Sequence, residues 1–349
     1  MTFRIGKHCI GADHPPFVIA EMSGNHNGDL GRALELVEQA KMAGASAIKL
    51  QTYTADTMTI DCDLPDFQIQ GGLWDGRNLY ELYEWAHTPW DWHKALFERA
   101  RELELECFSS PFDESAVDFL ESLDTPAYKV ASFELLDLPL IAYMAKTGKP
   151  MIMSSGMANQ AEIKEALTCA KDNGAKDIVL LHCISGYPTP IEQANLMTIP
   201  MLARDFGCQV GLSDHTLGTI ASTTAIALGA RVIEKHFTLR RADGGPDAAF
   251  SLEPEEFKRL TEDCFAAWQA LGKAGYEQRE AEKANLKFRR SIYVVEDIKA
   301  GDLFTEKNIR RIRPGYGLHP KHFKDILGQK ARRDFSRGEP LVKPPKESS

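Results

Sequence analysis

Residues 30–50 of the chain, LGRALELVEQAKMAGASAIKL, contain one complete copy of the pattern that decides the fold. The first part, Leu30–Ala43, has the apolar spacing of an amphipathic helix and stops at Gly44, as helices commonly do. The second part, Ala47–Leu50, is a short apolar run, which suits a parallel strand buried on both faces. This stretch therefore predicts a helix that leads into a strand of a parallel sheet.

Short apolar runs of the same kind recur along the chain, with helical segments between most of them. Eight strand–helix repeats within about 250 residues predict a (β/α)8 TIM barrel. A doubly wound sheet is the alternative, and it is disfavoured because no run leads into a G-x-G-x-x-G phosphate loop. The predicted strands are Phe17–Ala20, Ala47–Leu50, Leu105–Phe108, Ala127–Ala131, Pro150–Met153, Ile178–His182, Gln209–Leu212 and Arg231–Glu234.

The composition of the 349-residue chain is that of an ordinary globular protein, with 43% hydrophobic and 26% charged residues. Its net charge of −9 argues against a partner made of nucleic acid. No apolar run approaches the roughly 20 residues of a membrane-spanning helix, and the N-terminus lacks the pattern of a secretory signal. For this reason we expect no membrane partner. The seven cysteines are scattered, so we expect reduced thiols and a cytoplasmic protein.

The last part of the chain differs from the rest in charge and in the pattern of its residues. Residues 284–349 contain 16 Lys and Arg against 8 Asp and Glu, whereas residues 1–283 contain 25 against 42. The basic part also has short β-like runs separated by Gly and Pro. We therefore predict a barrel domain over 1–283, a small β-rich domain over 284–349 and a connector helix over about 254–284. Opposite net charges favour docking of the small domain onto a barrel, in one chain or across a dimer.

One interval between predicted strands is too long for a single helix. Between Leu50 and Leu105 there is room for an inserted loop over Thr52–Pro89, and this loop is rich in Trp and Tyr. Long loops at the top of a barrel are usually functional or act as lids. Packing within the loop is the alternative reason for its aromatic residues.

Polar side chains follow the predicted strands, at the end of a barrel where active sites lie. His215 and His236 follow neighbouring strands and could hold a divalent metal with open positions, although a pair of core histidines is as common. Lys49 and Lys129 could neutralise phosphate or carboxylate, or could pair with barrel glutamates. The other strand-end residues are Glu21, Gln51, Ser109, Ser110, Ser132, Ser154, Ser155, His182, Tyr187, Asp214 and Glu234.

Several segments together resemble the sialic acid synthases, which condense phosphoenolpyruvate with an amino sugar to give a nine-carbon 2-keto acid. The segments are AEMSGNHNGD, KLQTY, SSPFD, YKVAS, SSGMA, GLSDHT, EKHF and GGPDAAFSLEP, in this order. The tail, from FRRSIYV to RPGYGL, resembles the antifreeze-like (SAF) domain of that family. The segments LQTYTADTMT and GGLWDGRNLYELYEWAHTPWDWH are more similar to pseudaminic acid synthases, whose sugar is a 2,4-diacetamido-2,4,6-trideoxy-altrose. The resemblance thus implies a metal-dependent transferase.

The resemblance also implies a role for each matching residue. His215 and His236 match metal ligands that normally bind Mn²⁺, with Mg²⁺ or Co²⁺ as alternatives, and Arg313 matches an arginine that reaches over from the partner subunit of a domain-swapped homodimer. The residues expected to act in catalysis are Glu21, Glu234 and Lys129. The residues expected to hold phosphoenolpyruvate are Lys49, Ser110, Lys129, Ser132, Ser154 and Ser213. The residues expected on the sugar side are Gln51, Ser185, Tyr187, Asp247, Phe288 and Arg313.

Two departures from the family pattern lie on the sugar side. Ser185 stands where N-acetylneuraminate synthases often have Asn, and Ala248 follows Asp247 where many have His. The resemblance therefore favours a pseudaminic acid synthase, with an N-acetylneuraminate or legionaminate synthase as the alternative. A Schiff-base aldolase acting through Lys129 or Lys49 is a second alternative. A surface-binding role for the tail is disfavoured, because the tail is basic and has no regular array of Thr.

Overall fold

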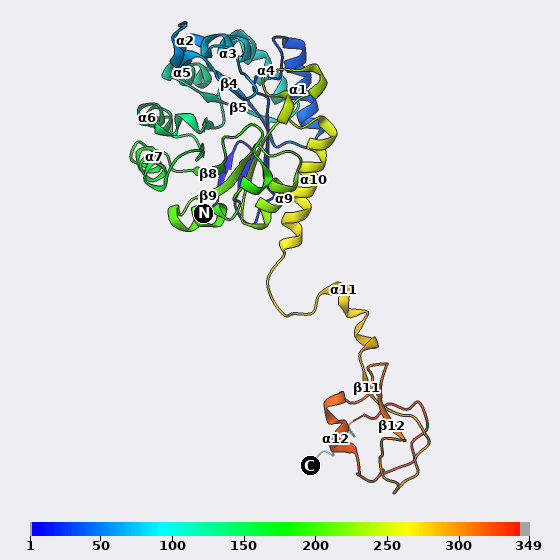
Figure 1. The fold of residues 1–349 in the computed structure, drawn as a ribbon. Coiled ribbons are helices and arrows are strands. Elements are labelled where there is room, and N and C mark those ends of the chain that lie inside the picture. The colour runs from blue at the N-terminus through cyan, green and yellow to red at the C-terminus, as the bar shows by residue number, and fades with distance from the viewer. Residues whose placement is uncertain (1, 343–349) are drawn as a thin grey trace. The chain divides into compact units, whose positions relative to one another are not determined.

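The structure is a computed structural model that describes residues 2–342, and the chain divides after Gly272 into two compact units (Figure 1). Within the described residues, the first unit contains a closed barrel of eight parallel strands with helices around its outside. The second unit is smaller and contains a two-stranded antiparallel sheet. The predicted fold class is therefore confirmed. The sequence had placed the domain boundary later, between residues 283 and 284.

The barrel strands coincide with the eight predicted apolar runs. Each strand pairs in parallel with the next, and the last strand pairs with the first to close the barrel. The strands are β3 (Phe17–Glu21), β4 (Ala47–Thr52), β5 (Glu106–Pro111), β6 (Tyr128–Val130), β7 (Met151–Ser154), β8 (Ile178–Cys183), β9 (Gln209–Asp214) and β10 (Val232–His236). A short hairpin of β1 (Phe3–Ile5) and β2 (His8–Ile10) precedes them.

The helix predicted from residues 30–43 is α1 (Leu30–Met42). The side chain of Asp29 accepts a hydrogen bond from the backbone N–H of Arg32 and so caps the first turn. Gly44, with φ of +81°, follows the helix in a conformation that favours glycine. The other barrel helices are α4 (Trp90–Glu102), α5 (Glu114–Ser122), α6 (Leu138–Lys146), α7 (Gln160–Asp172), α8 (Thr198–Phe206), α9 (Ile220–Ala227) and α10 (Pro254–Leu271).

The inside of the barrel is apolar at the N-terminal ends of the strands. Side chains alternate between the two faces of a strand, so Val232 faces the interior while Ile233 packs against the helices. Phe17 and Ile19 of β3 join Val232 in the interior cluster, and Ile5 of the N-terminal hairpin belongs to the same cluster. One position further along the inward face, the same strands carry polar side chains.

The predicted connector helix over about 254–284 is wrong in its extent. Helix α10 starts at Pro254 and ends at Leu271, and Gly272 follows with φ of +52°. Every residue from Leu271 to Glu280 is exposed, so there is no apolar face to hold a longer helix against the barrel. A single helical turn, α11 (Glu280–Lys283), then belongs to the second unit.

The second unit has its own small hydrophobic core. Strand β11 (Ser291–Val294) pairs antiparallel with β12 (Ile309–Ile312), and the short helix α12 (Phe323–Ile326) follows. Its buried core residues are Ile292, Val294, Ile298, Phe304, Ile309, Ala331 and Leu341. A small β-containing domain of this kind was predicted from the texture of the tail. No helix within residues 2–342 is both long enough and apolar enough to cross a membrane.

The predicted insertion forms two short helices and a hairpin-like loop. The helices are α2 (Ala55–Met58) and α3 (Leu79–Ala86), and a backbone bridge between Gln68 and Asn78 closes the loop between them. The segment therefore has a structure of its own and is not an open connection.

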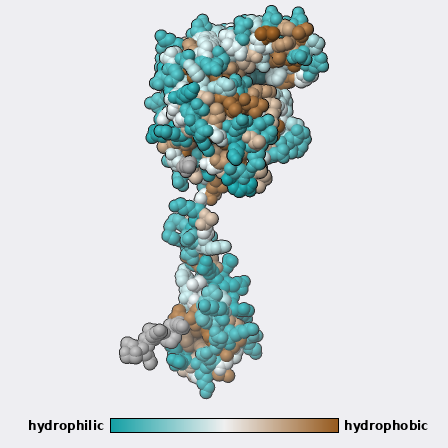
Figure 2. All heavy atoms as spheres, turned by 90° about the vertical axis from the view of Figure 1, so that its left-hand side faces the viewer, coloured by the Kyte–Doolittle hydropathy of each residue, from teal (hydrophilic) through white to brown (hydrophobic). Residues whose placement is uncertain are grey.

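The surface of the first unit is largely hydrophilic, with hydrophobic residues gathered near the middle of the face shown in Figure 2. Several exposed apolar side chains follow the barrel strands, among them Phe133, Met157 and Leu217, each more than 60% exposed. These three residues come after β6, β7 and β9, at the same end as the polar side chains. This end of the barrel therefore combines exposed apolar side chains with polar ones.

Candidate active site

A layer of buried polar side chains lies at the C-terminal ends of the barrel strands. The pairing of the strands brings these side chains to one level, because side chains alternate between the two faces of a strand. The inward positions that follow the apolar layer are Glu21 in β3, Lys49 in β4 and Glu234 in β10. These three side chains are at most 5% exposed. Charged groups buried this deeply are rare unless they are paired or bind a ligand.

Lys49 stands at the centre of this layer. Its Nζ lies 2.8 Å from Glu21 Oε2 and 3.2 Å from Ser110 Oγ. Gln51 Nε2 donates to the other oxygen of Glu21 at 2.8 Å and lies 3.1 Å from Ser23 Oγ. The predicted residues Glu21, Lys49, Gln51 and Ser110 thus form one connected network.

Glu234 joins this network to the second predicted lysine. Its Oε1 lies 3.9 Å from the Nζ atoms of both Lys49 and Lys129, and it accepts a hydrogen bond of 3.1 Å from Ser213 Oγ. Its other oxygen, Oε2, is buried without a hydrogen-bond partner among residues 2–342. The site therefore holds unused acceptor capacity beside two cationic groups.

The two carboxylates have different environments. Burial raises the pKa of Glu21 to about 7, although Lys49 opposes this shift. Burial also disfavours ionisation of Glu234, but Lys129 and Lys49 outweigh it and lower the pKa of that group. Carboxylates whose pKa values are pushed apart in this way can act as proton donor and acceptor in one site.

His215 and His236 come together, as predicted. Their ring centroids are 5.3 Å apart. His215 Nδ1 lies 3.0 Å from the carbonyl oxygen of Ile184, which can only accept, so Nδ1 carries a proton and the neutral ring has its lone pair on Nε2. His236 Nδ1 is buried without a hydrogen-bond partner within the described residues and lies 3.6 Å from Asp247 Oδ2.

This donor set fits a metal site with open positions. Two imidazoles and a nearby carboxylate are ligand types that Mn²⁺ accepts. Within residues 2–342, no group of three or more His, Cys, Asp or Glu side chains is arranged as a complete metal site. Any remaining ligands would have to come from substrate or water.

Serine hydroxyls line another part of the layer. Ser132 Oγ accepts a hydrogen bond of 3.2 Å from the backbone N–H of Gly156, and Ser154 Oγ is buried with no partner among the described residues. Gly156 allows this close approach, because a Cβ at this position would lie 2.4 Å from Ser185 Oγ and 2.6 Å from Ser132 Oγ and would displace both hydroxyls. The predicted residues Ser132, Ser154 and Ser185 therefore meet around the end of β7.

The predicted sugar side lies next to the histidines. The ring of Tyr187 is centred 4.5 Å from that of His215, and it also packs against Phe250. The carboxylate of Asp247 accepts a hydrogen bond from Ser23 Oγ, the same hydroxyl that lies near Gln51. Short contacts thus connect Tyr187, Asp247 and Gln51 to the two histidines and to Glu21.

Three strand-end candidates face the helices and not the interior. Ser109 Oγ lies 2.7 Å from the hydroxyl of Thr52, and His182 Nε2 lies 2.7 Å from a backbone carbonyl oxygen. Asp214 forms a buried ion pair of 3.0 Å with Lys235. Each lies one position from a residue that faces inward, so strand alternation excludes it from the layer.

Phe288 and Arg313 belong to the second unit. Phe288 is half exposed, and the exposed side chain of Arg313 forms no hydrogen bond or ion pair with the described part of the chain. Their assignment to the sugar site stays a prediction.

Sequence reasoning missed Glu134, which follows β6 in a 3-10 turn (Phe133–Leu136). Its Oε2 is buried without a partner among residues 2–342. Burial raises the pKa of Glu134 to about 7, with Lys129 as the main opposing charge. The position two residues after Ser132 was the only signal that could have pointed to it.

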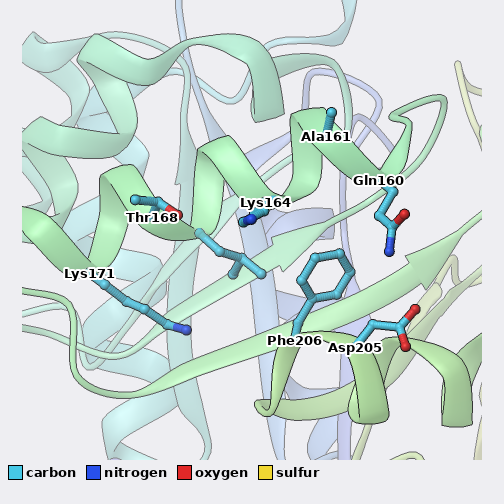
Figure 3. A pocket seen from close by; sticks show the side chains of 8 residues that line it. Gln160, Ala161, Lys164, Thr168, Lys171, Asp205 and Phe206 are labelled. Carbon is cyan, nitrogen blue, oxygen red and sulfur yellow. The ribbon is translucent and has the colours of Figure 1, made fainter.

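An open groove lies elsewhere on the first unit, away from the strand ends. It has a volume of about 560 Å³ and runs between α7 and α8, where Phe206 faces α7 beside Lys164 and Lys171 (Figure 3). These side chains lie on the outer helices and not at the strand ends. Volume alone is therefore a poor guide to the active site, and the convergence of buried charges makes the strand ends the candidate.

Comparison with known proteins points to the same conclusion. The model of the NeuB family matches residues 36–276, and that of the SAF domain matches residues 289–344. The chain is 46% identical to a pseudaminic acid synthase of Campylobacter jejuni, covering 94% of this chain and 96% of that protein. It is 36% identical to an N,N'-diacetyllegionaminic acid synthase of the same species, covering 92% of this chain and 97% of that protein.

A solved structure also matches the fold. The N-acetylneuraminic acid synthetase from Leptospira borgpetersenii, crystallised with citrate, has a TM-score of 0.74 and 30% identity to this chain. The match covers 83% of this chain and 96% of that one. The predicted resemblance is therefore confirmed: this chain belongs to the NeuB family of sugar acid synthases, with a C-terminal SAF domain.

Proposed function

We propose that this chain is a pseudaminic acid synthase. It condenses phosphoenolpyruvate with 2,4-diacetamido-2,4,6-trideoxy-altrose to a nine-carbon 2-keto sugar acid and releases phosphate. The observation that carries the proposal is the buried layer of two lysines, two glutamates and two histidines at the strand ends, in a chain 46% identical to pseudaminic acid synthases. A cytoplasmic location agrees with the seven cysteines, all of which are free thiols.

His215 and His236 would hold the divalent metal, Mn²⁺ or in its place Mg²⁺ or Co²⁺. Bound there, the ion would supply a Lewis acid for the aldehyde oxygen of the open-chain sugar. The orientation of His215 by the carbonyl of Ile184 and the unpaired Nδ1 of His236 support this assignment.

The cationic part of the layer would hold phosphoenolpyruvate. Lys49 and Lys129 supply positive charge for its phosphate and carboxylate groups. The hydroxyl of Ser110 already lies 3.2 Å from Lys49 Nζ, and Ser154 Oγ has no partner among the described residues. Ser132 and Ser213 complete the set of residues assigned to phosphoenolpyruvate, and the hydroxyl of Ser213 would have to turn away from Glu234 to donate to it.

The chemistry places a water molecule near the two glutamates. C3 of phosphoenolpyruvate attacks the aldehyde carbon of the sugar, which leaves positive charge at C2. Water adds to C2, and the tetrahedral adduct expels phosphate by cleavage of the C–O bond. Glu234 or Glu21 would take up the proton of this water or stabilise the positive charge, while Lys129 keeps the phosphate in place.

The sugar would lie against Gln51, Ser185, Tyr187 and Asp247. We further propose that Phe288 and Arg313 reach the sugar site from the SAF domain of a partner subunit in a homodimer. The guanidinium of Arg313 is exposed and has no partner within residues 2–342, which supports a contact outside its own unit. The exposed apolar side chains of Phe133, Met157 and Leu217 after the barrel strands support a covering partner at that end.

A phosphate-release assay with Mn²⁺ and phosphoenolpyruvate tests the choice of sugar. The panel contains the altrose derivative, N-acetylmannosamine and the 6-deoxy mannose analogue. The proposal predicts the highest kcat/KM with the altrose derivative. Higher activity with another sugar would instead indicate an N-acetylneuraminate or legionaminate synthase, and borohydride trapping of a keto acid on Lys129 together with activity in EDTA would indicate an aldolase.

A further inference from the structure

The loop between Gln68 and Asn78 is a closed hairpin that carries one side chain towards the active site. The backbone N–H of Ile69 donates to the carbonyl of Arg77 at 2.9 Å, which holds the two arms together. Gly71, Gly72 and Gly76 at its tip have φ between +77° and +83°, a region that glycine adopts without strain. From Gly71 to Arg77 every residue is exposed except Trp74, which is half-buried.

Trp74 is tied to the sugar side of the site by two contacts. Its Nε1 donates to the carbonyl oxygen of Pro246 at 2.9 Å, directly before Asp247. Its ring is centred 5.8 Å from that of Tyr187, which in turn lies 4.5 Å from His215. The indole therefore lies one aromatic ring beyond the metal pair.

The base of the insertion packs closely against the loops that follow β3 and β10. A Cβ on Gly24 would lie 2.5 Å from Pro246 Cγ and 3.0 Å from the carbonyl oxygen of Ala86. The loop after β3, the loop after β10 and the end of α3 thus meet at Gly24. This close contact holds the insertion over the sugar side of the barrel.

Two other large aromatic residues of the insertion, Trp85 and Tyr80, have contacts elsewhere. Trp85 is exposed, and the guanidinium of Arg77 lies 4.4 Å above its ring. The hydroxyl of Tyr80 donates to Asp56 at 3.2 Å. The contact with Tyr187 distinguishes Trp74 from both.

We propose that Trp74 is the specificity residue for the end of the sugar opposite the aldehyde, where it selects a methyl group over a hydroxymethyl group. This inference rests on the proposed function, which places the aldehyde at His215 and His236. Five carbon–carbon bonds span about 6 Å, because three backbone bonds of an extended chain span about 3.6 Å. The ring separations on this path, 4.5 Å from His215 to Tyr187 and 5.8 Å from Tyr187 to Trp74, are comparable with that length. A six-carbon sugar bound by its aldehyde at the histidines and extended along Tyr187 therefore directs its far end towards the indole.

The chemistry of the indole explains the selection. Its only polar group, Nε1–H, is already donated to Pro246 O. A methyl group packs well on the indole face, whereas a hydroxyl placed there would lose water without gaining a hydrogen bond. An apolar surface of this kind changes the ratio of the two kcat/KM values by about 10-fold to 200-fold.

The test compares two substrates that differ by one oxygen atom, namely the trideoxy-altrose derivative and its 6-hydroxy analogue. For wild type we expect the 6-deoxy sugar to be preferred about 10-fold or more in kcat/KM. Trp74→Ala should remove most of this preference and raise KM for the 6-deoxy sugar, while KM for phosphoenolpyruvate changes less than about twofold. Trp74→Phe keeps an apolar ring and should keep most of the preference, even if Trp74→Ala folds poorly.

Trp85→Ala is the matched control, because it removes an indole from the same insertion outside the site. We expect it to keep both the preference and the KM values. If wild type turns over both sugars and Trp74→Ala keeps the wild-type preference, the role of Trp74 is contradicted while the proposed function stands. If wild type releases no phosphate with either sugar, the proposed function fails, and the inference fails with it.

Discussion

The two ends of the barrel interior are built on the same strands but differ in chemistry. Near the strand N-termini, Phe17, Ile19 and Val232 pack into an apolar cluster. Near the C-termini, Glu21 and Glu234 occupy the next inward positions on the same strands. The first layer gains stability from burial, whereas the second keeps buried polar atoms that have no partner among residues 2–342. The comparison teaches that on β3 and β10 one step of the side-chain alternation separates the apolar packing layer from the candidate active-site layer.

Metal removal should give the largest effect on the polar layer. Dialysis against EDTA is expected to abolish phosphate release, because the Lewis acid for the sugar aldehyde is lost. Adding back Mn²⁺ should restore the activity, and the thermal midpoint should rise with the Mn²⁺ concentration. Full activity in EDTA would show that His215 and His236 are only core histidines.

Glu234→Gln should lower kcat by about 10²-fold to 10⁴-fold, the usual contribution of a positioned acid or base. The variant keeps the shape and the acceptor for Ser213 Oγ but removes the charge between Lys49 and Lys129. Steady-state phosphate release is the measurement, with circular dichroism as the check of folding. A kcat within threefold of wild type would exclude Glu234 from catalysis.

Ile19→Ala tests the apolar layer. Ile19 is completely buried, so its truncation should lower the free energy of unfolding by about 2–5 kcal/mol. Urea denaturation measures the loss, and kcat of the folded fraction should stay within about twofold of wild type. Ile60→Ala is the control, because Ile60 is 61% exposed and should cost less than about 0.5 kcal/mol. A large fall in kcat with unchanged stability would contradict the separation of the two layers.

Ser154→Ala should have the smallest effect of these four changes, and it should weaken substrate binding without lowering stability. Ser154 Oγ is buried without a partner among the described residues, so its removal should leave stability unchanged or raise it by about 1 kcal/mol. The same change should raise KM for phosphoenolpyruvate about tenfold, since a hydrogen bond to a charged group is lost. Loss of stability together with an unchanged KM would assign Ser154 to the scaffold.

Much of the site could be predicted because strand alternation carries a side chain to a known face. Lys49, Ser110 and Glu234 lie two positions from inward apolar residues, so the barrel prediction alone brings them together. The same rule, applied in register, would have excluded Ser109 and His182 from the interior. These parts of the prediction depended on local periodicity.

The remaining features depend on contacts between distant segments. Glu134 lies on a 3-10 turn, where strand alternation no longer sets the direction of the side chain. The hydrogen bond from Trp74 to Pro246 joins residues far apart in sequence. The end of α10 at Gly272 reflects the lack of an apolar face to pack, which the Ala- and charge-rich composition of the segment concealed.

The most direct test of the central claim follows the bridging oxygen of phosphoenolpyruvate. The substrate is labelled with ¹⁸O between C2 and phosphorus and is incubated with the altrose derivative, Mn²⁺ and the protein. Mass spectrometry of the released phosphate then shows which bond was broken. Cleavage of the C–O bond predicts that the label appears in phosphate, whereas unlabelled phosphate would contradict the proposed reaction.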